Sequence, residues 1–85
     1  MEIVMIKKKG CMPCKKFEPF VKETAEKNSL GFRTIMGESM PEKLQPPYYP
    51  FFYLYKDKSV LESWGGVSEK KLHSVLKRTL KKLKS

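Results

Sequence analysis

Two cysteines, Cys11 and Cys14, stand two residues apart in the stretch KKKGCMPCKKFEP, residues 7–19. A zinc site needs four ligands, and besides these thiols the chain offers only the distant His73. Carboxylates or a second chain would have to complete it, so we expect no metal. Two buried cysteines acting as small hydrophobes are a second reading. A C-x-x-C that follows a strand and opens a helix favours a third, a redox-active dithiol.

The spacing gives the two thiols different roles. Cys11 stands at the start of a helix expected over residues 12–27, where unpaired N–H groups and the helix dipole favour a thiolate. Cys14, three residues on, is close enough to attack a mixed disulfide formed by Cys11. Lys9 and Lys15 are candidates for lowering the pKa of Cys11 below that of a free thiol. Alternatively, these exposed lysines are screened and only keep the surface soluble.

The remaining sequence predicts a small α/β domain. Apolar and β-branched runs predict four strands, at residues 2–6, 32–36, 51–55 and 60–63. Residues 37–50 hold four prolines and predict a loop with one helical turn at 41–45. The last helix follows an N-cap at Ser68. Its apolar positions keep helical spacing at Leu72, Val75, Leu76, Thr79, Leu80 and Leu83. The order β-α-β-β-β-α predicts a single domain over residues 1–85, a four-stranded mixed sheet with helices on both faces.

The chain is strongly basic, with a formal net charge of +9. Residues 70–85 hold seven lysines and arginines and no acid, so the last helix suits nucleic acid or an acidic partner. We favour an ordinary solvated face, because no aromatic residues for base stacking are interleaved there. No segment is apolar enough to span a membrane, and the N-terminus does not read as a signal peptide. We therefore expect a cytoplasmic monomer, in which a permanent structural disulfide is disfavoured.

Four separated features resemble the thioredoxin/glutaredoxin superfamily, specifically a short thioredoxin-like protein of glutaredoxin size. Cys11-Met12-Pro13-Cys14 resembles the C-x-P-C dithiol, and Pro19 falls where the family's active-site helix carries a proline. Pro50, directly before the strand FFYLY, matches the family's cis-proline. Gly65 matches the glycine after the last strand that lines the family's substrate groove. The resemblance covers nearly the whole chain.

The resemblance implies a minimal thioredoxin fold and thiol–disulfide exchange, with Cys11 as nucleophile and Cys14 as resolving thiol. It implies a cis bond between Tyr49 and Pro50, and no cofactor beyond the Cys11–Cys14 disulfide. The substrates would be disulfide-containing proteins, and a thioredoxin-reductase-type or glutathione-linked reductant would recycle the enzyme. The candidate substrate-binding residues are Met12, Pro13, Tyr49, Pro50, Gly65 and Gly66.

Departures from the family pattern leave two alternatives open. Gly10 replaces a tryptophan, and Met5 replaces a buried aspartate that serves many thioredoxins in proton transfer. Val67-Ser68 replaces the acidic pair that helps glutaredoxins hold glutathione, so protein disulfides are favoured over the alternative of a glutaredoxin using glutathione. A non-catalytic binding module that docks through its basic C-terminal helix is the other alternative. The intact cysteines and Pro50 argue against it.

Overall fold

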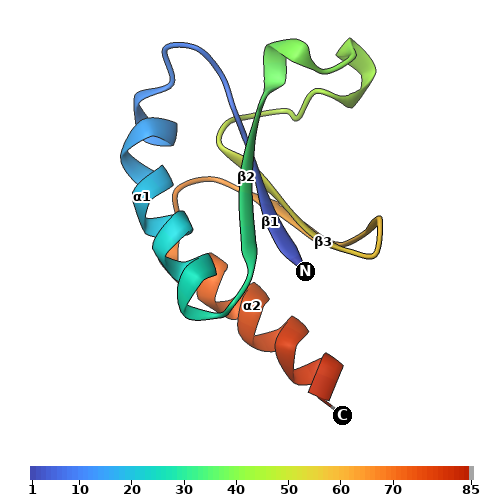
Figure 1. Cartoon of the computed structure of the whole chain (residues 1–85). Coiled ribbons are helices and arrows are strands. Elements are labelled where there is room, and N and C mark those ends of the chain that lie inside the picture. Colours follow the sequence, from blue (N-terminus) through green and yellow to red (C-terminus); the bar gives the residue numbers. More distant parts are fainter. Residues whose placement is uncertain (85) are drawn as a thin grey trace.

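The computed structural model describes residues 1–84, and Figure 1 shows how its elements are arranged. The elements are β1 (Glu2–Lys7), α1 (Met12–Lys27), β2 (Gly31–Met36), β3 (Phe51–Lys56), β4 (Ser59–Gly65) and α2 (Glu69–Lys84). Two short 3-10 turns, η1 (Gly37–Ser39) and η2 (Glu42–Leu44), interrupt the loop between β2 and β3. The predicted order β-α-β-β-β-α is confirmed; the first three strands each extend one residue beyond their predicted ranges, and β4 extends three.

The sheet is mixed and four-stranded, in the order β2-β1-β3-β4. β1 runs parallel to β2 and antiparallel to β3, which pairs antiparallel with β4. β1 is a central strand, and all four residues 3–6 are at most 1% exposed. A strand buried on both faces needs apolar side chains at consecutive positions, which is why the run EIVMI lacks alternation.

Both helices pack on one face of the sheet, so the expectation of helices on both faces is wrong. The core cluster joins Phe17 and Val21 of α1 and Leu72 and Val75 of α2 to the same sheet residues. Those sheet residues include Met5, Phe52 and Trp64, which lie side by side across three strands. The rings of Phe20 in α1 and His73 in α2 meet edge to face, with centroids 5.7 Å apart, so the helices are neighbours.

The other sheet face lacks a helix because the connection that could carry one, residues 37–50, is rich in proline. This connection forms only the turns η1 and η2. Val4 and Ile6 alternate with Ile3 and Met5 and therefore point to this face, where they are nonetheless buried. Phe51, Tyr53 and Tyr55 lie there half-buried in a row, with successive ring centroids 5.4 Å and 6.4 Å apart.

The helix starts follow the sequence signals. Pro13 lies in the first turn of α1, where its missing N–H leaves no hydrogen bond unmade. Ser68 caps α2, because its Oγ accepts the main-chain N–H of Lys71 at 3.1 Å. Leu72, Val75 and Leu76 are buried as their spacing predicts, and the side chain of Leu83 lies outside the described residues. Within residues 1–84, neither helix combines the length and apolar character needed to cross a bilayer.

Candidate active site

Cys11 and Cys14 form a disulfide at the N-terminal end of α1, with their Cα atoms 5.3 Å apart. Cys11 is the N-cap of α1, and the main-chain N–H of Cys14 donates a hydrogen bond to Cys11 Sγ at 3.2 Å. A sulfur at this position meets an unpaired N–H and the positive end of the helix dipole. Both favour negative charge on Cys11 once the disulfide is reduced.

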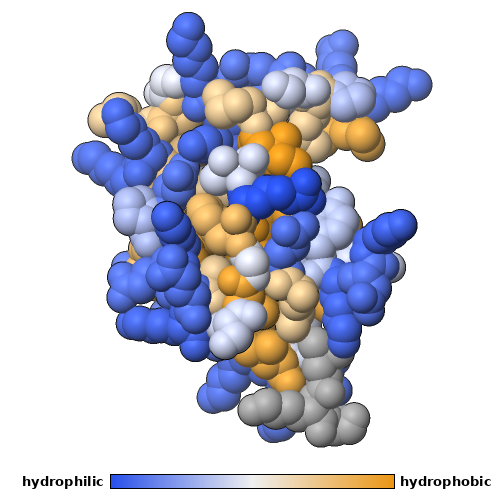
Figure 2. Space-filling model, viewed as in Figure 1, coloured by the Kyte–Doolittle hydropathy of each residue, from blue (hydrophilic) through white to orange (hydrophobic). Residues whose placement is uncertain are grey.

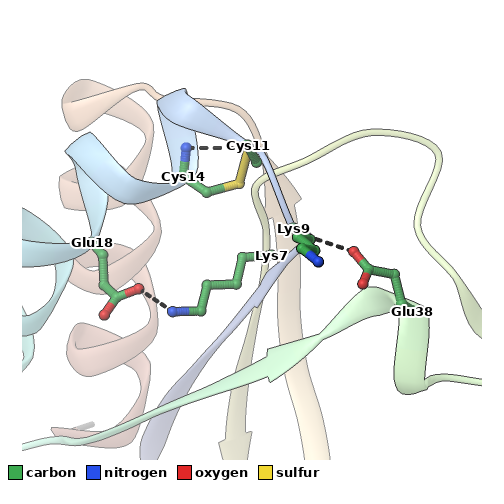
Figure 3. The surroundings of a disulfide bond; sticks show 6 residues. All are labelled: Lys7, Lys9, Cys11, Cys14, Glu18 and Glu38. Atoms are coloured by element: carbon green, nitrogen blue, oxygen red, sulfur yellow. Dashed lines mark hydrogen bonds and ion pairs between the residues drawn. A yellow bond between two sulfur atoms is a disulfide. The ribbon is translucent and has the colours of Figure 1, made fainter.

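The two sulfurs differ in accessibility. Cys11 is half-buried at the surface, whereas Cys14 is 1% exposed and belongs to the core cluster. Figure 3 shows Cys14 on the first turn of α1, with Cys11 on the connection that leads into it. An external disulfide can therefore approach Cys11, while Cys14 can react only with its neighbour.

The bond between Tyr49 and Pro50 is cis and lies at the same end of the sheet as the dithiol. This placement follows from the strand register, because Phe51 pairs with Ile6 near the end of β1, just before the turn into Cys11. The Pro50 carbonyl accepts the N–H of Gly66 at 2.9 Å. Among the described residues, no main-chain hydrogen bond joins the N–H or C=O of Tyr49 to another backbone group. Those two groups suit an extended peptide.

The two glycines after β4 differ in their surroundings. Gly65 packs against the rings of Tyr48 and Phe51, which occupy the space where a Cβ would stand. Gly66 has φ +93° and no neighbouring heavy atom within 4 Å of an added Cβ. Gly66 is therefore open to a ligand, whereas Gly65, which lacks a Cβ, leaves room for the Tyr48 ring to pack against it.

An apolar surface adjoins the dithiol. Met12 and Val67 are 58% and 53% exposed, and they line an open cavity of about 330 Å³ together with Pro13, Lys16 and Phe17. Met12 and Pro13 were predicted to contact substrate. Val67 was missed, because a valine in the Gly-Gly-Val-Ser connection carries no signal of its position beside Met12.

A second cavity of about 480 Å³ holds both cysteines, and lysines form much of its wall. Lys15, one of the two lysines proposed to lower the pKa of Cys11, lines it together with Lys7 and Lys8, whereas Lys9, the other candidate, does not. The main-chain N–H of Lys9 donates to Glu38 at 2.6 Å instead (Figure 3). Lys8 Nζ lies 5.4 Å from the centre of the Tyr49 ring, which places a cation beside the residue that precedes Pro50.

The sequence analysis also missed an ion pair close to the dithiol. Lys7 Nζ and Glu18 Oε1 are 2.7 Å apart, and both side chains are about two-thirds buried, at 29% and 33% exposure. Figure 3 shows Lys7 reaching from β1 to Glu18 on α1, one turn beyond Cys14. The alternation Ile3, Met5, Lys7 does place Lys7 on the helix-bearing face, and this signal was available in the sequence.

The described residues contain no cluster of three or more His, Cys, Asp or Glu side chains that could hold a metal ion. His73 lies against Phe20 on the helical layer and takes no part in the dithiol site. Hydrophilic side chains cover much of the surface in Figure 2, with a strip of apolar side chains between them.

No family model matches the sequence, and no curated protein matches it. Solved structures resemble it in fold. Thioredoxin 1 from Thermosipho africanus aligns over 100% of both chains, with a TM-score of 0.85 and 18% identity. Thioredoxin f2 of Chlamydomonas reinhardtii aligns with a TM-score of 0.79 and 20% identity, over 91% of this chain and 76% of its own.

Reduced Schistosoma mansoni thioredoxin aligns over 89% of this chain and 75% of its own, with a TM-score of 0.74 and 25% identity. These structures are similar to this chain in overall fold. The chain is therefore thioredoxin-like in fold, and it carries a C-x-x-C pair at the start of its first helix.

Proposed function

We propose that the protein is a dithiol–disulfide oxidoreductase that reduces protein disulfides. One observation carries the proposal: an accessible N-cap cysteine is bonded to a buried cysteine one helical turn away, at the end of the sheet where the cis Tyr49–Pro50 bond lies. This arrangement separates the group that attacks a substrate from the group that releases it. The thioredoxin-like fold supports the same chemistry.

The first step is attack by Cys11. In the reduced protein, the Cys11 thiolate attacks one sulfur of the substrate disulfide. A bond forms between Cys11 Sγ and that sulfur, and the substrate S–S bond breaks. The second substrate sulfur leaves as a thiolate and takes a proton from water. The N–H of Cys14, which donates to Cys11 Sγ at 3.2 Å, supports the attacking thiolate.

The second step releases the substrate. Cys14 loses its proton to solvent in the cavity and attacks Cys11 Sγ, so the Cys11–Cys14 bond forms and the mixed disulfide breaks. The released substrate sulfur takes up a proton. Overall, the dithiol is oxidised by two electrons and the substrate disulfide is reduced by two, which yields two substrate thiols. The free N–H and C=O of Tyr49 and the open Gly66 would hold the substrate backbone during both steps.

A thiol-based reductant must then reduce the Cys11–Cys14 disulfide again. We propose a thioredoxin-reductase-type or glutathione-linked system, acting in a cytoplasmic compartment that keeps the net direction toward reduction. Protein substrates are favoured over glutathione disulfide, because Val67 and Ser68 supply no acidic side chain for a glutathione amino group. The enzyme would act as a monomer.

Insulin reduction tests the proposal. The wild-type protein should accelerate the precipitation of insulin chains with dithiothreitol as reductant, and should couple either to thioredoxin reductase or to glutathione with glutathione reductase. The coupled assays identify the recycling system, whereas dithiothreitol tests the chemistry independently of it. Cys11→Ser should abolish the acceleration, because it removes the nucleophile.

A matched control replaces Ser74, an exposed residue of α2, with alanine, which should leave the rate unchanged. No acceleration by the wild type with any of the three reductants, or an undiminished rate in Cys11→Ser, would overturn the proposed function.

A further inference from the structure

Positive charge is concentrated around the accessible sulfur. Five lysines flank the disulfide, three in the segment before it and two directly after it: Lys7, Lys8, Lys9, Lys15 and Lys16. Within residues 1–84, two carboxylates contact this group: Glu18 binds the Lys7 ammonium, and Glu38 accepts the main-chain N–H of Lys9. Five lysines against two glutamates leave an excess of three positive charges around Cys11.

Four of these ammonium groups lack a carboxylate partner within the described part of the chain. Lys8, Lys9, Lys15 and Lys16 are exposed, and the ion pairs found among the described residues involve other cations. Their positive potential is therefore not neutralised by the protein itself. The carboxylates of a bound ligand could pair with these lysines and neutralise their charge.

The lysines stand where a substrate would lie. Lys8 projects over the Tyr49 ring, next to the main-chain groups proposed to hold the substrate backbone. Lys15 lines the cavity that contains both cysteines, and Lys16 lines the adjoining apolar cavity with Met12 and Val67. Lysines thus line both cavities at the dithiol, and Met12 and Val67 provide an apolar contact in the cavity that Lys16 lines.

Resting on the proposed function, we infer that the substrate is a protein whose reactive disulfide is flanked by acidic side chains and by an apolar residue. Its carboxylates pair with Lys8, Lys15 and Lys16, and the apolar side chain packs on Met12 and Val67. These pairs form at an exposed surface, so they act mainly by speeding association of the correct substrate. Substrates with basic flanks are repelled by the same lysines.

The test compares two short cystine-bridged peptides that share one sequence, except that the residues beside the reacting cysteine are glutamates in one and lysines in the other. Each peptide carries a fluorophore and a quencher that separate when its disulfide is reduced. Stopped-flow measurement of the fluorescence gives the second-order rate constant for reduction by the pre-reduced protein. At 20 mM salt the acidic peptide should react at least about tenfold faster. In about 1 M salt the ratio should approach one, because the screening length falls to about 3 Å.

Two triple variants of equal charge separate a local effect from the field of the whole chain. In Lys8→Gln/Lys15→Gln/Lys16→Gln, the preference for the acidic peptide should fall several-fold at 20 mM salt. The control Lys22→Gln/Lys71→Gln/Lys77→Gln removes three exposed lysines outside the two cavities and should keep most of the preference.

Equal rates for the two peptides in wild type at low salt would overturn the inference, as would an equal loss in both triple variants. If neither peptide is reduced, both the proposed function and the acidic-substrate inference fail. If both are reduced without preference, the proposed function stands and only the acidic-substrate inference falls.

Discussion

The main-chain N–H of Cys14 donates to Cys11 Sγ at 3.2 Å, so the second cysteine contributes to the reactivity of the first. The resolving residue supplies a hydrogen bond to the attacking sulfur through its backbone, before its own side chain takes part. The contact exists because Cys11 is the N-cap of α1 and Cys14 occupies the third helical position. A change of side chain at Cys14 therefore keeps this donor.

The Cys14→Ser variant isolates the reactivity of Cys11. The helix N-terminus, the Cys14-position N–H and the nearby lysines should hold the pKa of Cys11 below that of a free thiol. The rate of iodoacetamide alkylation, measured against pH on the reduced variant, should rise through this lowered pKa. An inflection at or above that of a free cysteine would contradict the account.

The same shift predicts a pH dependence of stability in the reduced protein. A lowered folded-state pKa contributes stability that is present above the pKa of the unfolded thiol and is lost as the pH falls through the folded value. Urea unfolding of reduced Cys14→Ser at several pH values measures this term, and reduced Cys11→Ser/Cys14→Ser provides the baseline. A Cys14→Ser stability that follows the baseline at every pH would show that folding does not perturb the thiol.

Gly37 supports the substrate side of the site through Tyr49. A Cβ at Gly37 would overlap Oη and Cε1 of the Tyr49 ring, so Gly37→Ala should displace that ring and destabilise the protein by about 1–3 kcal/mol. Insulin reduction should slow several-fold, because Tyr49 directly precedes the cis-proline. Thermal unfolding and initial rates measure the two effects.

Gly31→Ala is the matched control, because Gly31 pairs with Glu2 at the beginning of β1, whereas Cys11 follows the end of that strand. Its added Cβ would approach Glu2 Cβ to 3.2 Å, a contact that a shift of a few tenths of an ångström relieves. If Gly37→Ala retains both stability and rate while Gly31→Ala does not, Tyr49 is not held as described.

The Lys7–Glu18 pair should couple β1 to α1 beneath the dithiol. A double-mutant cycle with Lys7→Met and Glu18→Gln should give a coupling free energy of up to about 1 kcal/mol in urea unfolding. The pair Glu23–Lys27 is the control: it lies on α1 with side chains 63% and 73% exposed, so about 0.3–0.5 kcal/mol is expected. If the coupling free energy of Lys7–Glu18 is no larger than that of the control pair, partial burial does not strengthen the ion pair.

The sequence predicted the elements well because their signals are local. Consecutive apolar residues in EIVMI, Pro13 at a helix start and the Ser68 cap each depend on a few neighbours along the chain. The C-x-x-C at a strand–helix junction is equally local, and it placed the dithiol correctly. The face on which each helix packs depends instead on the path of connections, and the Pro-rich residues 37–50 carry no helix to the second face.

Other features of the site could not be predicted from the sequence, because they depend on contacts between residues far apart in the chain. Lys8 and Lys9 are adjacent and identical in type, yet only Lys8 lines the dithiol cavity. Val67 meets Met12 only after β4 has returned the chain to the start of α1. Gly65 was expected to border the substrate, and only the packed structure places the Tyr48 ring over it.

Trapping of a mixed disulfide tests the central claim most directly. Reduced Cys14→Ser should react with a disulfide-containing peptide and stop at the first step, because no resolving thiol remains. Mass spectrometry of the intact protein should show one attached peptide half, and peptide mapping should place it on Cys11. Reduced Cys11→Ser, under the same conditions, should form far less adduct. Equal or preferential adduct formation at the buried Cys14 would contradict the assignment of Cys11 as the nucleophile.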